Sequence, residues 1–337
     1  MSRIKDPEYI YAVSRIKTVE NRLLSRNDIN RMIDSATAEE ALKVLTDARY
    51  GRQGAENPEA RDFERLLAEE GKKLYVLLRS IAPDPQVFDL FLQPHDFHMV
   101  KVILKAEFAG IEDFDRYLSG KGSMEAEKLK NMIRERTFSS LPGVMRRAIE
   151  EALDDFHHTG DMKAVDFIVD RACFQRMREI AEAFNHTFLK DYVACLADLR
   201  NMDIYLRLKP GERNREFLQR VLLPGGYIAA ERFFPRRDPV EKELAAELRR
   251  TPYGTWAREA AEDYRTGGGL NWLEEAYHEV SRGFIRKGGS KISGLEPLIA
   301  YLLRKERELG TVRRIMTGKL NRISAERIRE GLGRLYA

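Results

Sequence analysis

The segment DFHMVKVILKAEFAG, residues 96–110, has two similar segments later in the chain, DLRNMDIYLRLKPG at 198–211 and ELGTVRRIMTGK at 308–319. Each begins with an acidic residue, Asp96, Asp198 or Glu308. Apolar residues stand one, four, seven and eight positions after the acid, and these spacings place side chains on one face of an α-helix. The apolar residues are Phe97, Val100, Ile103 and Leu104, then Leu199, Met202, Tyr205 and Leu206, and finally Leu309, Val312, Ile315 and Met316.

A glycine stands near the end of each segment, at Gly110, Gly211 and Gly318. Glycine tolerates the left-handed conformation of a helix C-cap, so we expect each helix to end there. Further apolar pairs precede the acids, at 90–91, 192–193 and 302–303. Each segment is therefore predicted to belong to one long amphipathic helix.

The three acids are 102 and 110 residues apart. Units of about that length account for all 337 residues, so we expect three helical repeat units at 1–114, 115–211 and 212–337. This interpretation predicts equivalent settings for the three acids and burial of the three apolar faces. The alternative is chance, because any amphipathic helix shows this spacing, but the near-equal steps argue against it.

The fold class is predicted to be all-α, because no alternating run bounded by hairpin turns indicates a strand. Short connections between many helices favour helical bundles. Caps are expected at Asn27 or Asp28, at Thr37 with Glu40 as a capping box, at Asp161 and at Ser324. Helices are expected at about 9–24, 28–33, 38–45, 60–81, 129–138, 144–156, 162–208, 217–222, 240–249, 255–264, 270–285 and from 325 onward.

The composition is typical of a globular protein with a charged surface, since hydrophobic residues make up 43% and charged residues 33%. No apolar run approaches the roughly 18–20 residues of a membrane helix. The N-terminus MSRIKDPEYIYAV is charged where a signal peptide needs apolar residues, so we expect a cytoplasmic protein. Cys173 and Cys195 are the only cysteines, which argues for a reducing compartment without disulfides.

Positive charge is concentrated in the last part of the chain. From Ser281 onward there are 14 Lys and Arg residues against 5 Asp and Glu residues, a local charge of +9, although the whole chain carries only +4. Such a surplus can meet an acidic protein, a lipid surface or nucleic acid, or it can simply solvate helices. The candidate partner-binding residues are Arg313, Arg314, Lys319, Arg232, Arg236 and Arg237.

No pattern of catalytic or ligand-binding residues stands out. The chain lacks the G-x-x-x-x-G-K-[ST] phosphate loop and the G-x-G-x-x-G fingerprint. His278–Glu279 lacks the second histidine of a zinc protease helix, and His95 with His98 has no Cys or carboxylate set beside it. We therefore expect no catalytic site, no cofactor and no metal.

The combination of several weak motifs is more specific than each motif alone. The stretch YIYAVSRIKTVENRLLSRNDINRMIDSATAEEALKVLTDARYG, from Tyr9 to Gly51, has a Tyr-x-Tyr opening, followed by Arg15, Glu20, Leu23–Leu24 and a closing Tyr50–Gly51. HDFHMVKVILKAEFAG follows from His95, the helix around Leu199–Arg207 comes next, and KERELGTVRRIMTGKLNRISAERIREGL follows from Lys305. In this order, across the whole chain, they resemble the C subunit of the archaeal and bacterial V/A-type ATPases, the counterpart of the d subunit of the vacuolar enzyme.

The resemblance implies a funnel-shaped all-helical body of three similar domains in a pseudo-threefold arrangement. It implies a monomeric, non-catalytic rotor component on the cytoplasmic face of the membrane rotor ring, with a socket for a central shaft made of the D and F subunits. It implies a role in ATP-linked proton or sodium transport, with membrane contact only through the complex and no nucleic acid as partner.

One position departs from the family pattern. The family often carries Asn three residues after the repeated acid, and here only Asn201 keeps it, whereas Met99 and Thr311 stand in the other copies. The hydrogen bond made by that Asn is therefore in doubt in those copies. The alternative function is a helical nucleic-acid-binding or scaffold protein that uses the basic C-terminal region, with Arg232, Arg236 and Arg237 near Phe233 and Phe234.

Overall fold

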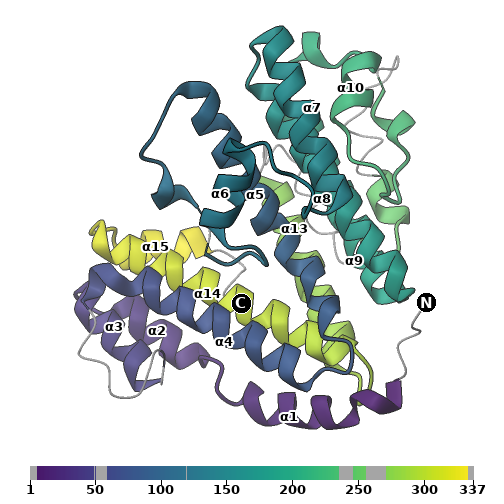
Figure 1. Cartoon of the computed structure of the whole chain (residues 1–337). Coiled ribbons are helices and arrows are strands. Elements are labelled where there is room, and N and C mark those ends of the chain that lie inside the picture. The colour runs from purple at the N-terminus through teal and green to yellow at the C-terminus, as the bar shows by residue number, and fades with distance from the viewer. Residues whose placement is uncertain are drawn as a thin grey trace. The chain divides into compact units, whose positions relative to one another are not determined.

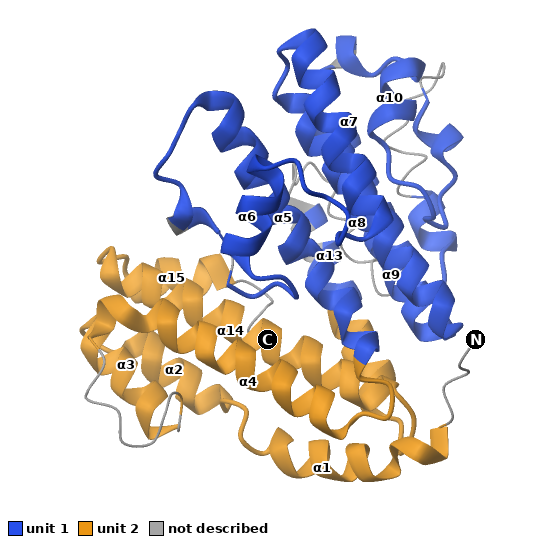
Figure 2. Ribbon diagram, viewed as in Figure 1, with its two compact units in different colours: residues 1–4, 86–280 blue, residues 5–85, 281–337 orange. Residues whose placement is uncertain are grey.

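The computed structural model describes residues 6–48, 50, 59–118, 120–234, 246–255 and 271–332. In these residues the regular structure is helical, without a β-strand, which confirms the all-α prediction. The chain forms two compact units, unit 1 from residues 86–280 and unit 2 from residues 5–85 and 281–337, apart from the residues not described (Figure 2). None of the described helices combines the length and apolar composition needed to cross a bilayer.

Unit 2 joins the two ends of the chain in one helical body (Figure 1). Its longest helix, α14, is contacted by α1, α3, α4 and α15. One continuous apolar core contains side chains of α2, α3 and α4 together with Leu309, Ile315 and Ile328 from the C-terminal part. Its elements are η1 (Asp6–Tyr9), α1 (Ile10–Glu20), α2 (Arg26–Asp34), α3 (Ala38–Asp47), η2 (Ala60–Asp62), α4 (Phe63–Ile81), the end of α13 (Asn271–Gly289), α14 (Glu296–Leu320) and α15 (Ala325–Leu332).

Unit 1 is organised around α8, which packs against α5, α7, α9 and α10. Two ion pairs brace α5 against α8: Lys101 Nζ lies 2.6 Å from Asp170 Oδ1, and Lys105 Nζ lies 2.6 Å from Asp166 Oδ2. Its elements are η3 (Pro85–Phe88), α5 (Asp89–Ala109), η4 (Asp115–Tyr117), α6 (Ala126–Arg134), α7 (Gly143–Thr159), α8 (Lys163–Phe184), α9 (Thr187–Arg207), η5 (Pro210–Glu212), α10 (Arg215–Val221), η6 (Ala230–Phe233) and the start of α13.

The helix caps agree with the sequence prediction in part. Thr37 caps α3 by accepting the Glu40 N–H, but the Glu40 carboxylate accepts from Ala36 N–H. The predicted cap of α2 at Asn27 or Asp28 is wrong: Ser25 is the cap, and its side chain and that of Asp28 each accept the other's backbone N–H. This capping box places the start of the helix upstream of Asp28.

The long helix predicted over 162–208 is two helices, because Asn185 adopts the left-handed conformation with φ of 48° between α8 and α9. The helices predicted at 240–249 and 255–264 lie largely outside the described residues. The two compact units do not follow the predicted boundaries at 114 and 211, and the three repeat units with their threefold arrangement remain a prediction.

Candidate functional site

The three repeated acids lie within long helices: Asp96 in α5, Asp198 in α9 and Glu308 in α14. Asp96 and Asp198 are buried, with exposed fractions of 1% and 0%, and the side chain of Glu308 is 8% exposed. Burying a carboxylate is costly unless hydrogen bonds or a cation compensate for its lost hydration. We call these three groups the anchor carboxylates. Each of them must be compensated by its hydrogen bonds, and these hydrogen bonds show which chain segment it holds.

Asp96 holds the segment before α6. Its Oδ1 accepts the backbone N–H of Met124 at 3.1 Å, and its Oδ2 accepts the hydroxyl of Ser123 at 2.6 Å. Burial raises the pKa of Asp96 above its ordinary value, and the hydrogen bonds from the 123–124 segment oppose that rise.

Asp198 holds the segment before η6 in the same way. Its two oxygens accept the backbone N–H groups of Tyr227 at 2.8 Å and Ile228 at 3.0 Å. The hydroxyl of Tyr253 adds a third hydrogen bond at 2.6 Å. Burial raises the pKa of Asp198 to about 6, against the lowering effect of these donors.

Glu308 holds the segment before α2, which comes from the other end of the chain. Its Oε2 accepts the backbone N–H of Leu24 at 2.5 Å. Its Oε1 accepts from the Tyr50 hydroxyl and from Lys305 Nζ, the latter at 2.6 Å. Lys305 also lies 3.7 Å from the carboxylate of Glu70. This anchor carboxylate thus has a buried cation beside it, whereas no described cation forms an ion pair with Asp96 or Asp198.

Two glycines make room for the aspartates. A Cβ atom at Gly122 would lie closer than 3.0 Å to Asp96 Oδ1, and one at Gly226 would lie equally close to Asp198 Oδ1. Real Cβ atoms essentially never approach other atoms so closely. These partner segments were not predicted from the sequence. Their signal was a glycine 26 residues after Asp96 and 28 residues after Asp198.

The departure at the Asn position has a structural consequence. Asn201 pairs with Leu223 in both directions, donating to its carbonyl at 2.9 Å and accepting its N–H at 2.7 Å. Met99 has no group for such a pair, and the Thr311 hydroxyl donates to the Arg307 carbonyl within α14. The side-chain pairing of Asn201 is thus particular to α9.

The three apolar faces are buried, with one exception. The face residues Val100, Ile103 and Leu104 of α5 are buried, and so are Val312, Ile315 and Met316 of α14. Leu206 is only half-buried, as is Val102, which is not one of the face residues. The predicted glycine endings are correct only for Gly110, which caps α5 with φ of 64°. Helix α9 already ends at Arg207, ahead of Pro210. Gly318 lies inside α14, where a side chain would collide with Ile328.

The predicted cationic residues of α14 bind groups within unit 2. The Arg313 guanidinium makes two hydrogen bonds to Glu64, at 2.7 and 3.0 Å. Arg314 donates to the Gly331 carbonyl at 3.5 Å, and Lys319 donates to the Ser35 carbonyl at 2.6 Å. These contacts tie α14 to α4, α15 and the end of α2, and a role in partner binding stays a prediction.

The predicted basic and aromatic cluster is described only in part. Arg232 lies 3.7 Å from Glu247, and the Arg215 guanidinium lies over the ring of Phe234 at 5.3 Å. Phe233 is buried. Arg236 and Arg237 lie outside the described residues.

A pocket of about 410 Å³ lies in unit 1 between α7, α8 and α10, and the rings of Phe167 and Phe217 meet edge to face in its lining. Its polar groups support the helices: Asp161 accepts the Lys163 N–H at 2.8 Å, and Arg171 donates to the Gln219 carbonyl. These two contacts give part of the polar lining of the pocket a structural explanation. The predicted cap at Asp161 is one residue early, because α8 begins at Lys163 and Met162 is its N-cap.

Both cysteines, Cys173 and Cys195, are buried and free, as expected. Burial raises the pKa of each thiol, so neither is a reactive thiolate at neutral pH.

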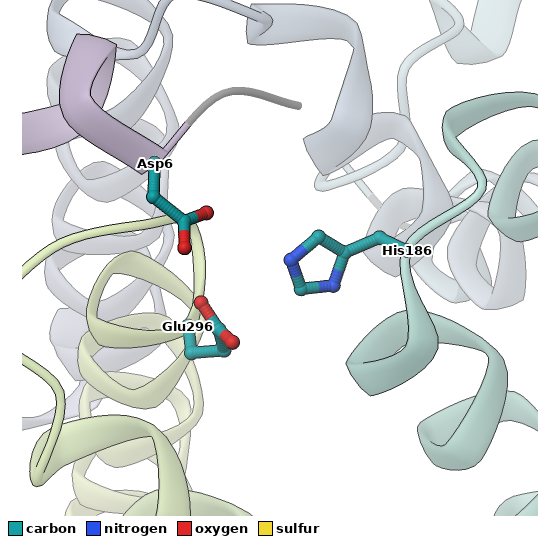
Figure 3. A group of neighbouring side chains, drawn as sticks. All are labelled: Asp6, His186 and Glu296. Carbon is teal, nitrogen blue, oxygen red and sulfur yellow. The ribbon is translucent and has the colours of Figure 1, made fainter. Parts of the chain in front are cut away.

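An acidic pair lies at the start of α14. Figure 3 shows the Asp6 and Glu296 side chains, whose oxygens come within 4.8 Å of one another. Gly294, with φ of 93°, lies between them, because a Cβ there would meet both carboxylates. His186, also labelled in Figure 3, belongs to unit 1, so the three residues do not form a site within one unit.

The arrangement of the anchor carboxylates holds chain segments in place. Backbone N–H groups fix the anchor carboxylates, and tyrosine hydroxyls bonded to them have raised pKa values, Tyr50 and Tyr253 both through burial first. Such hydroxyls act as permanent hydrogen-bond donors at neutral pH.

Similarity to known proteins extends over nearly the whole chain. The family model described as ATP synthase (C/AC39) subunit matches residues 12–331. The chain is 25% identical to the C subunit of the A-type ATP synthase of Methanocaldococcus jannaschii, covering 95% of this chain and 85% of that protein. It is 24% identical to the C subunit of the V-type sodium ATPase of Enterococcus hirae, covering 95% and 97%. It is also 24% identical to the C subunit of the A-type ATP synthase of Pyrococcus furiosus, covering 96% and 90%. The chain therefore belongs to the ATP synthase (C/AC39) subunit family.

Proposed function

We propose that this ATP synthase subunit is the non-catalytic rotor component that couples a central shaft of D and F subunits to the membrane rotor ring. The match to the family over residues 12–331 carries the proposal. The relatives match over most of their own length and are C subunits of A-type and V-type enzymes. The protein would sit at the cytoplasmic face and touch the membrane only through the complex.

The internal bracing of unit 1 supports a mechanical role. Ion pairs between α5 and α8 involve Lys101 and Lys105, and Arg200 of α9 lies 3.3 Å from the same Asp170 that binds Lys101. Side chains from three helices thus share one charge network. Such a network resists sliding of the helices past one another. A subunit that transmits torque needs this resistance.

The first experiment tests the partners directly. The purified chain is mixed with a D–F shaft complex and with detergent-solubilised rotor ring, and the complexes are separated by size. We expect a ternary complex that contains one copy of the chain. Failure to bind either partner at micromolar concentrations would contradict the proposal.

A second experiment addresses the cationic residues of α14. Arg313 is 37% exposed at its side chain, so it can reach a partner at an interface rim while bound to Glu64. Reversal of Arg313 and Arg314 to Glu should slow association and reduce its salt dependence, because rim charges act mainly on association rates. The matched control is reversal of Arg220 and Arg250, exposed arginines of unit 1 that pair with Asp155 and Glu247. Equal binding by both folded variants and the unmutated chain would remove Arg313 and Arg314 from the interface.

The absence of a phosphate loop gives a third expectation, that the isolated chain neither binds nor hydrolyses ATP. Titration calorimetry checks this. Micromolar ATP binding would argue for a catalytic or regulatory nucleotide role instead.

A further inference from the structure

We propose that the three anchor carboxylates are equivalent latches, each fastening the segment that opens one predicted repeat to the long helix of the repeat before it. The first latch joins Asp96 to Met124, the second joins Asp198 to Ile228, and the third joins Glu308 to Leu24. The third latch connects the last predicted repeat back to the first, because the segment that it holds belongs to the N-terminal repeat. This proposal does not depend on the identity of the partners.

The latched amides occupy equivalent positions in the chain. Leu24, Met124 and Ile228 are 100 and 104 residues apart, close to the spacing of the acids themselves. Each amide stands two residues before a helix, since α2 begins at residue 26, α6 at 126 and η6 at 230. Three unrelated hydrogen bonds would have no reason to share this register.

The order of the latches is cyclic in sequence. The first two hydrogen bonds span 28 and 30 residues forward along the chain, whereas the third spans 284 residues backward. The first repeat thus supplies the segment that Glu308 holds, as a repeat following the third would do if the chain continued the pattern. Both partners of the third latch lie within unit 2, so this closure is one of the contacts that join the two ends of the chain in one unit, beside their shared apolar core.

The chemistry of each latch matches its opening segment. In the first two latches a glycine stands two residues before the latched amide, at Gly122 and Gly226, and the acid is aspartate. In the third latch Arg22 stands at that position, and the acid is glutamate, which is one methylene longer. The longer side chain can reach the amide where a Cβ atom keeps the segment further from the helix.

The latches make a conformational device. A carboxylate that is buried and bonded to backbone N–H groups resists displacement of the segment, because each released N–H would be left without an acceptor. A force on the helix that follows an opening segment is therefore passed to the long helix of the preceding repeat. A release of one latch would loosen that connection and leave the other two closed.

Amide hydrogen exchange of the full-length chain tests the proposal, because exchange rates report local opening. In the unmutated chain, the amides of Leu24, Met124 and Ile228 should be protected although they lie outside helices. Asp96→Leu, Asp198→Leu and Glu308→Met keep the approximate side-chain size and remove the acceptors. Each should lower protection at its own amide by about tenfold or more, with smaller changes at the other two.

The matched control is Asp113→Leu, at an exposed acid of the same region. Unchanged protection of Met124 in Asp96→Leu, or of Leu24 in Glu308→Met, would overturn the equivalence of the latches. If a variant does not fold, Ser123→Ala is the milder change, since it removes only the hydroxyl on Asp96. Amides of Leu24, Met124 and Ile228 that exchange like unstructured peptides in the unmutated chain would also refute the proposal.

Discussion

The anchor carboxylates of unit 1 and the anchor carboxylate of unit 2 solve one physical problem in two ways. Asp96 and Asp198 are surrounded by neutral donors, and a glycine lets the backbone approach them closely. Glu308 is longer, none of the described glycines lies against it, and it is bonded to the ammonium of Lys305 and the hydroxyl of Tyr50.

The comparison shows that both units place a buried acid at the same position of a long helix, whereas the groups that compensate its lost hydration differ. Burial is the main cause of the raised pKa of both aspartates, and no described cation pairs with either of them. In unit 2 Lys305 lies among Glu308, Glu70 and the ring of Tyr50, so it supplies the positive charge that the anchors of unit 1 lack. The two kinds of anchor should therefore respond to different substitutions.

The largest effect is expected for Lys305→Met. It leaves the buried carboxylate of Glu308 without its cation, and breaking such a pair costs about 3–5 kcal/mol. The free energy of unfolding from urea titration measures the loss. The double variant Lys305→Met with Glu308→Gln should recover part of it, because the uncompensated charge is gone. A loss below about 1 kcal/mol would show that Lys305 does not compensate Glu308.

Truncation of a core side chain to alanine should lower the free energy of unfolding more in α5 and α14 than in α9. Leu104→Ala and Met316→Ala each remove a fully buried side chain, and we expect losses of about 2–5 kcal/mol. Leu206→Ala should cost clearly less, since Leu206 is only half-buried. Chemical denaturation ranks the three variants. An equal loss for Leu206→Ala would mean that the half-exposed face of α9 carries as much packing energy as the others.

Asp198 should give unit 1 a pH dependence that Asp198→Asn abolishes. Its pKa is about 6 in the folded chain, against the ordinary value of 3.8 expected in the unfolded chain. The protonated group therefore favours folding fully below about pH 3.8, and this contribution is lost as pH rises through about 6. Tyr253 and Cys195 beside it keep their protons in this range, because burial raises both pKa values.

The measurement is the free energy of unfolding of both proteins from about pH 4 to about pH 7. The unmutated chain should lose stability relative to Asp198→Asn by up to about 3 kcal/mol. A pH-independent difference would place the folded pKa of Asp198 near its ordinary value.

A glycine packed against the anchor carboxylate is found at both anchors of unit 1. Gly226→Ala forces a methyl group against Asp198, and overpacking of this kind costs about 1–3 kcal/mol. The matched control is Gly211→Ala, where a Cβ atom meets nothing within 4 Å. Thermal unfolding compares the two variants, and similar melting temperatures would contradict the close approach.

The smallest effect is expected for Arg313→Ala. Its pair with Glu64 is partly exposed, at 37% and 53%, and solvent weakens such a pair to about 0–1 kcal/mol. Urea titration in low and high salt should show a small loss that salt removes. A loss as large as that of Lys305→Met would reveal a buried role that the geometry does not indicate.

Much of the local structure was predictable because it depends on neighbours in the chain. Helical spacing around Val100 and Val312 identified buried faces, and Ser324 was recognised as the cap before α15, where it accepts the Arg327 N–H at 3.4 Å. Predictions failed where a single residue changed the local geometry. Asn185 interrupts a helical pattern by turning left-handed, and Gly318 fits inside a helix because α15 packs over it.

The sequence by itself determined that the chain is helical, that three amphipathic helices share a pattern, and that each carries an acid at the same position. It also contained the family resemblance, which the match over residues 12–331 bears out. Only the tertiary structure decided what those acids bind and that both ends of the chain share one core. The physical reason is the distance along the chain. Helix periodicity repeats every few residues, whereas the partner of Glu308 lies 284 residues away. The local sequence pattern of α14 therefore cannot predict that Glu308 binds Leu24.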